Sequence, residues 1–500
     1  MRRALKNLVG VIGGESLLRN GLYNVVGQTL RGAASLVAIP FLIRFLGIRE
    51  YGVWSLAYAV LAVLAMSEAG ISVAAAVFLS KDLAKRDFAE FGRTLTIILI
   101  GAVLVSVVLG LLLWFAGPLI VRSLPGFEVA DRVHAGRALQ IASLAVSILV
   151  LQRTLVGVEQ AFDRYATTNV LELVQSLVTN VGLVVVAWSG GRTIALMKWQ
   201  VFAFALLLAA HCCVVFLLLH RKGLSFDWSA EKARRMLRYS VATWTATLGS
   251  AAFSQFDRLI VGGVLGPSVL GVYAVITNIT SKINSFSATA VQPLVPSLSR
   301  DASLSGAEDR IRQATRLNAL IAIGAGSFLY VLADWIMRML APGATARQDI
   351  VGLQIAVVIY VLYSLNAPGH YILFSIGEAR INAVVTVSSG IISLALIFAG
   401  ARYFGLLGAV VGNAGYLGTL FLVALALKKL GIELRRYVAW LASPLLSLLA
   451  ALVVGLFLEN HLWWRVGFVA LQCAVLSLFF FRTRTASGWV RFDDGRVPES

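Results

Sequence analysis

The chain has few charged residues and no long hydrophilic segment. Only 14% of its 500 residues are Asp, Glu, Lys or Arg, whereas 59% are hydrophobic, and the mean hydropathy is +0.83. This composition excludes a soluble globular protein and is typical of a polytopic membrane protein. The longest loops, of about 20 residues, are too short for a folded extramembrane domain, which takes roughly 50 residues or more.

Motifs for nucleotide hydrolysis and for hydrolytic catalysis are also missing. The sequence has no G-x-x-x-x-G-K-[ST], no H-E-x-x-H and no G-x-S-x-G, so it shows no ATPase or hydrolase machinery. Any transport must therefore be driven by an ion gradient, the membrane potential or a downstream sink. We expect no enzymatic activity and no cofactor.

Cysteine is scarce. Cys212, Cys213 and Cys473 all fall in apolar stretches and lack metal-ligand spacing, which excludes a disulfide framework and a cysteine metal centre; we expect no metal site. No cleavable signal peptide is expected either, because the first apolar run is too long and continues into further runs.

Long apolar runs dominate the chain. A helix needs about 20 apolar residues to cross the hydrocarbon core, and barrel strands would instead alternate over about ten residues. The expected fold is all-α and polytopic, with about fourteen transmembrane helices near residues 21–46, 51–79, 94–121, 136–158, 166–188, 194–219, 236–262, 268–297, 317–340, 350–376, 382–404, 407–427, 437–458 and 462–481.

The sequence repeats one motif at corresponding positions of two halves. Leu46-Gly47 is followed after four residues by Gly52-Val53-Trp54, and Leu265-Gly266 is followed likewise by Gly271-Val272-Tyr273. An even number of spans separates the copies, so the halves should lie parallel and be related by an axis along the membrane normal. Internal repeats of this kind are typical of transporters.

The net charge of +18 is distributed as the positive-inside rule predicts. Most Lys and Arg fall on one set of alternating loops, which places both termini in the cytoplasm; no nucleic-acid partner is implied. The densest cluster contains Arg221, Lys222, Lys232, Arg234, Arg235 and Arg238. We interpret it as facing the anionic leaflet.

The expected parts are a cytoplasmic segment 1–20, an N-lobe 21–219, a basic loop 220–235, a C-lobe 236–427, two further spans in 428–481 and a cytoplasmic tail 482–500.

Polar side chains line one face of several spans. The first span carries a basic residue near its middle, and a lone arginine there should face a polar cavity or a partner. Serine and threonine also occur as glue between membrane helices. The candidate cavity residues are Asn24, Gln28, Arg31 and Ser35 in span one, Thr243, Thr247 and Ser250 in span seven, and Asn278 and Lys282 in span eight.

Three acids lie within or near spans. Glu68, Glu172 and Asp257 are candidate counter-ions for Arg31 and Lys282 or candidate coupling sites, with pairing favoured. Asp257 and Arg258 form a possible local pair, and Arg153 is close enough to the inner interface to extend toward it.

Two further features interrupt apolar stretches. Pro368 and His370 place a helix breaker and a titratable group inside span ten, which predicts a kink or gate where backbone lines a cavity. His211 is expected to be an isolated packed or interfacial residue.

With these motifs, the chain resembles the polysaccharide transporter branch of the multidrug/oligosaccharidyl-lipid/polysaccharide exporter superfamily, over residues 20–425 or so. The resemblance rests on the order of weak motifs: Ile39-Pro40 to Gly47, Tyr51-Gly52-Val53-Trp54, Glu68-Ala69-Gly70, Gln255 to Ile260, Leu265-Gly266, Gly271-Val272-Tyr273 and Gly377-Glu378-Ala379-Arg380.

The resemblance implies two six-helix lobes around a central cavity, with two C-terminal helices outside the repeat. It implies a flippase of the bacterial inner membrane that moves a polyprenyl-pyrophosphate-linked saccharide outward, for exopolysaccharide, capsule or O-antigen. Partners would be this substrate, membrane lipids, and polymerase and chain-length or export proteins of the pathway. Three alternatives stay open: a multidrug/cation antiporter of the same superfamily, a membrane-embedded polymerase or ligase, and a non-transporting scaffold. The peptidoglycan-precursor flippase is a closer relative than these alternatives and also has fourteen spans, but the motifs of this chain resemble the polysaccharide branch more.

Overall fold

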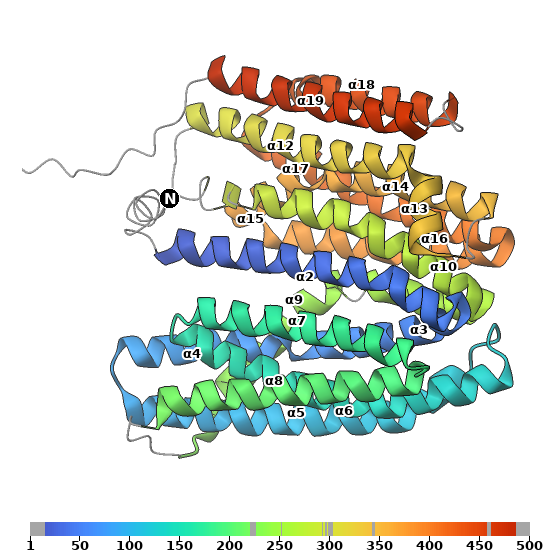
Figure 1. Ribbon diagram of the computed structural model, residues 1–500. Helices are drawn as coiled ribbons and strands as arrows, with labels where there is room; N and C mark the ends of the chain where they lie inside the picture. Colours follow the sequence, from blue (N-terminus) through green and yellow to red (C-terminus); the bar gives the residue numbers. More distant parts are fainter. Residues whose placement is uncertain are drawn as a thin grey trace, which may run out of the picture. The chain divides into compact units, whose positions relative to one another are not determined.

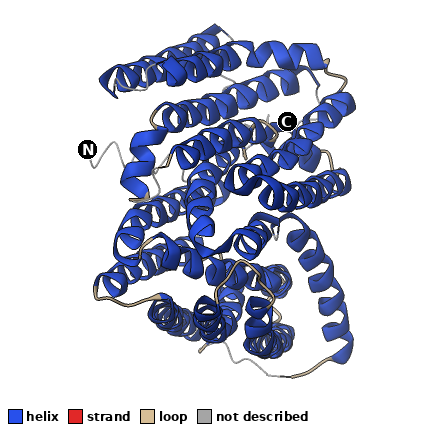
Figure 2. Cartoon of the chain, turned by 90° about the vertical axis from the view of Figure 1, so that its right-hand side faces the viewer, coloured by secondary structure: helices blue, strands red, loops and turns tan. Residues whose placement is uncertain are grey.

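The computed structural model describes residues 16–220, 227–251, 253–292, 294–295, 298, 304–342, 346–457 and 462–486. Within these residues every regular element is a helix (Figure 2). In chain order (Figure 1) they are α2 (Ser16–Leu46), α3 (Ile48–Ala65), η1 (Met66–Glu68), α4 (Ala69–Ala84), α5 (Phe88–Arg122), α6 (Val129–Ala161), α7 (Tyr165–Trp188), α8 (Thr193–Leu219), α9 (Ala230–Ala251), α10 (Phe253–Val291), α12 (Leu304–Val331), α13 (Ala333–Leu340), α14 (Arg347–Ser364), α15 (Ala367–Ser375), α16 (Ala379–Gly412), η2 (Asn413–Leu420), α17 (Phe421–Leu430), α18 (Leu434–Phe457) and α19 (Leu462–Ala486).

The helices confirm the expected polytopic all-α fold. Among the described residues, 10 helices are long and apolar enough to cross a membrane. Two of them contain an internal break: the 37-residue helix Gln255–Val291 and the 52-residue helix Ala379–Leu430. Each contains a glycine with positive φ, Gly266 in the first and Gly405 in the second, so each is two helices joined at a break. All fourteen expected windows overlap helix.

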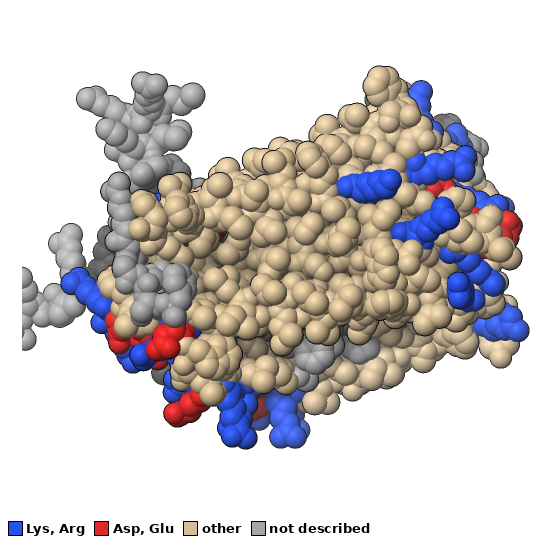
Figure 3. All heavy atoms as spheres, turned by 90° about the horizontal axis from the view of Figure 1, so that it is seen from below, with Lys and Arg blue, Asp and Glu red and all other residues tan. Residues whose placement is uncertain are grey.

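Lipid-facing surfaces follow from the sequence of the long helices. On α5, Leu104, Leu111 and Phe115 are more than half exposed, which is stable where the solvent is hydrocarbon. Figure 3 shows the same property on the face that includes α5, where charged side chains gather at the two ends and the middle is nearly free of charge.

The two Leu-Gly turns adopt the same backbone conformation. Gly47 has φ 79° and ψ 160°, and Gly266 has φ 82° and ψ 175°, a region that favours glycine. The turns also contact each other reciprocally. A β-carbon on Gly52 would collide with the carbonyl oxygen of Pro267, and one on Gly271 would collide with that of Ile48. The repeat seen in the sequence is therefore a local two-fold contact in the structure, as in an isologous interface.

The chain divides into two compact units. The first comprises residues 1–279, 337–352 and 386–415, and the second comprises 280–336, 353–385 and 416–500. In the first unit α6 packs against α5 and α8, and α2 packs against α7. An apolar cluster including Leu79, Phe91, Leu95 and Val158 closes the end where α4 meets α5. In the second unit α12 packs against α18 and α19, and α15 packs against α17.

Candidate functional site

Two arginines share one carboxylate within the membrane helices of the first unit. Arg31 on α2 lies 2.9 Å from Glu172 Oε2, and Arg153 on α6 lies 2.7 Å from Glu172 Oε1. We call Arg31, Arg153 and Glu172 the arginine cluster. The expected pairing of Glu172 with Arg31 is present, whereas Arg153, expected to extend toward the interface, is held by Glu172. With two cations and one anion, the cluster carries one net positive charge.

A second acid lies beside the arginine cluster. Glu68, at the end of η1, is 7% exposed. Its carboxyl group is hydrogen-bonded to Ser72, and Arg153 is close enough to act on it electrostatically. Its Oε2 atom is buried without a hydrogen-bond partner. Arg153 therefore lies near Glu68 as well as Glu172, whereas the sequence pointed only to Arg31 and Lys282 as partners of these acids.

Amide side chains line the α6–α7 and α2–α7 contacts near the cluster. Gln152 donates a hydrogen bond to Gln175 over 2.6 Å, and Asn169 donates to the Tyr165 carbonyl over 2.8 Å. Asn169 also packs on Gly27, where an added β-carbon would lie 2.9 Å from its Oδ1. Ser35, a predicted cavity residue, donates to the Gly32 carbonyl over 2.8 Å and so bonds within its own helix.

Asp257 belongs to a separate buried network around the repeat motif of the second half. Its carboxylate accepts hydrogen bonds from the Tyr273 hydroxyl at 3.0 Å and from the Arg258 backbone N–H at 2.7 Å. The Arg258 guanidinium donates to Asn278 Oδ1 over 2.6 Å, and Asn278 donates to the Tyr51 hydroxyl over 3.3 Å. Asn278, expected to line the cavity, thus connects the two repeated motifs.

The helix interruption expected in span ten is present in the second unit. α14 ends at Ser364 and α15 begins at Ala367, so Pro368 occupies the first turn of α15, where proline is tolerated. His370 Nδ1 lies 2.9 Å from Asn382 Oδ1. Asn366, between the two helices, donates a hydrogen bond over 3.0 Å to the Thr419 hydroxyl on η2.

The remaining predicted cavity residues are less fully described. Lys282 is half-buried on α10, in the second unit. The side chains of Asn24, Gln28, Thr243, Thr247 and Ser250 lie outside the described residues.

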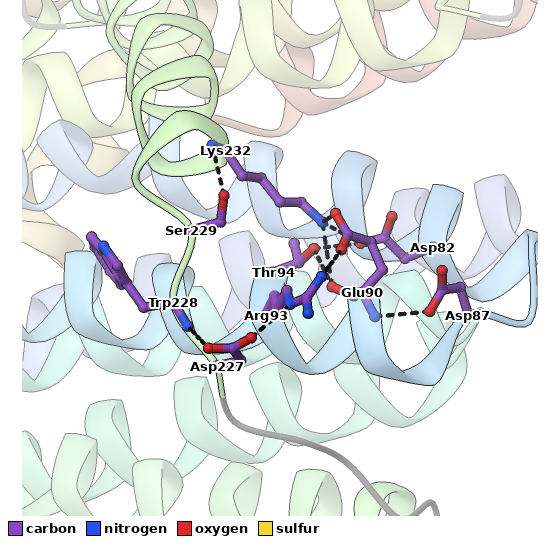
Figure 4. Close-up of polar contacts among 9 residues, drawn as sticks. All are labelled: Asp82, Asp87, Glu90, Arg93, Thr94, Asp227, Trp228, Ser229 and Lys232. Carbon is purple, nitrogen blue, oxygen red and sulfur yellow. Dashed lines mark hydrogen bonds and ion pairs between the residues drawn. The ribbon is translucent and has the colours of Figure 1, made fainter.

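An ion-pair network holds the segment in which the basic loop between the halves leads into α9 (Figure 4). Lys232 lies 3.2 Å from Asp82 and 2.7 Å from Glu90, and Arg93 lies 3.0 Å from Asp227. Because the Lys232 side chain is only 7% exposed, the expectation that the whole basic cluster faces the leaflet is wrong for this residue. Arg234, Arg235 and Arg238 are exposed. The network fixes the start of α9 to the ends of α4 and α5.

Sequence reasoning did not find the partner of one buried polar group. His211 Nδ1 on α8 lies 2.7 Å from Glu159 Oε1 on α6, and both side chains are 0% exposed. The expectation that His211 is isolated is therefore wrong, because its partner lies 52 residues away in sequence. The only available signal was that both residues interrupt apolar stretches.

The chemistry available to these residues is binding. The arginine cluster offers guanidinium groups, which bind phosphate oxygens in bidentate geometry, and the amides offer partners for hydroxyl groups. Among the described residues, no group of three or more His, Cys, Asp or Glu is arranged to hold a metal ion.

The fold and the polar groups within its membrane helices define a polytopic membrane protein. A family model described as "Polysaccharide biosynthesis protein" matches residues 17–301, which is more than half of the chain. The chain belongs to this family, as its motifs indicated. No match was found among curated proteins.

Solved structures show the same fold. The lipid II flippase MurJ in an inward closed conformation aligns with a TM-score of 0.75 over 92% of this chain and 99% of its own, at 14% identity. An inward-facing multidrug resistance MATE transporter aligns with a TM-score of 0.68 over 83% and 95%, also at 14% identity. A transporter of the same superfamily from Pyrococcus furiosus, for which the reverse polarity of the binding pocket suggests a different function, aligns with a TM-score of 0.52 over 85% and 96%, at 14% identity.

Proposed function

We propose that the chain is a flippase that moves a polyprenyl-pyrophosphate-linked oligosaccharide from the cytoplasmic to the outer leaflet by alternating access, for polysaccharide export. The observation that carries this proposal is the arginine cluster. Two guanidinium groups inside membrane helices share one carboxylate, so an incoming pyrophosphate can replace Glu172 without leaving either cation unpaired. Membership in a polysaccharide biosynthesis family supports the same substrate class.

The rest of the substrate would be bound by weaker groups. Asn169, Gln152 and Gln175 offer hydrogen bonds to sugar hydroxyls beside the cluster. Lys282 is proposed as a further phosphate-binding cation, as its place in the polar face of span eight suggests. The isoprenoid tail would stay in lipid. Both termini are proposed to lie on the cytoplasmic side of a bacterial inner membrane. Polymerase and chain-length or export proteins would use the product after it reaches the outer leaflet.

The membrane potential supplies a direction. Moving a negative headgroup outward from a negative interior is favoured by about 2.3 kcal/mol per charge per 100 mV, so two charges gain roughly 4 to 5 kcal/mol. Voltage alone is thus a sufficient driving force, and neither Glu68 nor Asp257 is required as a coupling acid.

The second candidate function is multidrug/cation antiport, which the likeness to the MATE transporter favours. A cationic drug requires an acidic site, whereas the arginine cluster is net positive. A polymerase or ligase of the pathway is less supported, since such an enzyme needs catalytic groups on sizeable outer loops.

The proposal is tested by polymer export in cells that depend on this chain. Arg31→Ala and Lys282→Ala should each strongly reduce export at unchanged membrane levels, because each removes a phosphate-binding cation. Arg380→Ala, which removes an exposed arginine, is the matched control and should export normally. Normal export by a stably inserted Arg31→Ala, Lys282→Ala double variant would contradict the assignment.

A further inference from the structure

The loop between α5 and α6, residues 123–128, lies on the break of α10. Gly126 donates a backbone hydrogen bond to the Gly263 carbonyl over 2.8 Å. An added β-carbon on Gly126 would lie 2.6 Å from the Gly266 nitrogen, and one on Gly266 would lie 2.5 Å from the Gly126 oxygen. All of these residues belong to the first unit. Two backbone segments far apart in sequence therefore touch with no side chain between them.

A proline explains why the Gly263 carbonyl needs a donor from outside its own helix. In an α-helix this carbonyl would accept a hydrogen bond from the residue four positions later. That residue is Pro267, which has no N–H group. Gly263 is buried, and a buried carbonyl without a donor destabilises the fold. The Gly126 N–H supplies the missing donor.

The second half departs from the sequence repeat where the loop covers it. When the halves are aligned on the Leu-Gly pair, Arg44 corresponds to Gly263. Arg44 is exposed and Gly263 is buried. A β-carbon on Gly263 would lie 3.0 Å from Leu124 Cδ2 in the loop. The glycine is thus explained by the close approach of the loop, which has no counterpart on the exposed Arg44.

The same loop is also held to the turn of the first half. Arg49, at the start of α3, lies 2.7 Å from Glu128 and 2.8 Å from Asp131. Phe127, beside Glu128, is 2% exposed, and its ring lies 3.6 Å from a β-carbon placed on Gly262. We call residues 123–128 the strap, because they contact both Leu-Gly turns, which also contact each other.

We infer that the strap holds the two Leu-Gly turns together and must release α10 before the chain can open toward the outer leaflet. This inference rests on the proposed function and orientation, which put the strap on the outer side. Alternating access requires the contacts between the halves on that side to separate in one state. Loops that open and close in this way often limit the rate of turnover.

The contacts of the strap indicate which side lets go. Its ion pairs are with Arg49 of the first half, and the covalent connections to α5 and α6 also lie in that half. Its hold on α10 consists of the Gly126–Gly263 hydrogen bond and the packing of Leu124 and Phe127. Release from α10 therefore separates no ion pair, and the strap leaves with the first half.

Reversible cross-linking tests the release. Leu124→Cys and Gly263→Cys would be combined in a background lacking the three native cysteines, since these positions are in contact. A short, reducible bifunctional thiol reagent would join them in proteoliposomes that hold a short-chain polyprenyl-pyrophosphoryl sugar. We expect flipping to fall in proportion to the cross-linked fraction and to return after reduction.

A matched cysteine pair joins the helices that flank the strap without touching α10. A β-carbon on Gly136 of α6 would lie 3.7 Å from the β-carbon of Pro118 on α5, a separation that suits a disulfide or a short bridge. Pro118→Cys with Gly136→Cys, joined by the same reagent, should keep flipping. This control separates release of the strap from cross-linking at its base.

The outcomes distinguish this inference from the proposed function. Flipping that continues after complete cross-linking of Leu124→Cys to Gly263→Cys, or that stops equally in the matched pair, would overturn the inference and leave the flippase proposal standing. Failure of the test pair to cross-link in inserted protein would do the same, since the contact is its premise. Absence of flipping by the wild type would overturn both.

If the double variant does not insert, hydrogen exchange of the wild type decides. Peptides covering residues 123–128 should exchange faster once the sugar substrate and a voltage are applied, because the Gly126 N–H loses its acceptor on release. The α7–α8 loop, residues 189–192, does not contact α10 through such a bond and serves as the reference. Unchanged exchange of the strap during flipping would overturn the inference.

Discussion

Gly52 packs so closely on the backbone of Pro267 that no side chain fits between them. The equivalent residue of the second half, Gly271, packs in the same way on Ile48, the equivalent of Pro267. Glycine is therefore required at both positions for one reason, the mutual contact of the two repeated turns. This contact joins the two halves of the sequence at the turns that begin α3 and restart α10.

Gly52→Ala is expected to disturb this contact. The added methyl group overlaps a backbone oxygen that cannot rotate away, and overpacking of this kind costs about 1 to 3 kcal/mol. Gly52→Ala and Gly271→Ala should lower the melting temperature of the purified protein by similar amounts, because the two positions are equivalent. Gly101→Ala, on a helix with nothing within 4 Å of the added carbon, is the control. Equal melting temperatures for all three variants would refute the contact.

Lys232 is expected to matter for stability rather than for lipid attraction. Replacing it with Met removes the cation from Asp82 and leaves Glu90 paired with Arg93 alone. Breaking a buried ion pair typically costs about 3 to 5 kcal/mol; the partial exposure of Glu90 and its pairing with Arg93 lower this toward about 2 kcal/mol. Arg234→Met, which removes an exposed charge from the same loop, should leave thermal stability nearly unchanged. If the two variants melt alike, Lys232 is not a structural tether.

The ion pair between Asp227 and Arg93, at the end of the inter-lobe loop, should weaken in acid. The Trp228 backbone N–H and the Arg93 guanidinium lower the pKa of Asp227 below its usual value of 3.8. A carboxyl group with a lowered pKa stabilises the fold above that usual value and loses this contribution as the pH falls through the folded value. Hydrogen exchange of residues 227–232 should therefore be slower than in Asp227→Asn at pH 5, and the difference should shrink as the pH falls below 3.8. A constant difference would contradict this pairing.

Topology can be tested with single cysteines at two exposed loop or helix-start positions, Ala230 and Pro125, in a background lacking the three native cysteines. The positive-inside distribution predicts that an impermeant thiol reagent labels residue 125 in intact cells and labels residue 230 only after lysis. Labelling of residue 230 but not of residue 125 would invert the orientation.

Much of the fold was predictable because it depends on local composition. Apolar runs predict the membrane helices, and the repeated Leu-Gly motif predicts equivalent turns, which Gly47 and Gly266 adopt. The spacing of polar residues also identified Arg31 and Glu172 as a candidate ion pair, since an arginine in a membrane helix needs a partner.

What the sequence did not reveal depends on contacts between distant residues. Glu159 and His211 meet because α6 and α8 pack at one register, and no spacing within either helix encodes that register. Lys232 has the same residue type as its neighbours in a basic loop, and only the ends of α4 and α5 distinguish it. For the same reason the pairing of Arg153 with Glu172 was not anticipated.

The most direct test of the central claim is flipping of a short-chain polyprenyl-pyrophosphoryl sugar in proteoliposomes at an imposed voltage without a pH gradient. The arginine cluster as a pyrophosphate site predicts that the rate follows the voltage, that Glu68→Gln and Asp257→Asn keep most of it, and that an Arg31→Ala, Arg153→Ala double variant loses it. Undiminished voltage-driven flipping by the double variant would contradict the account.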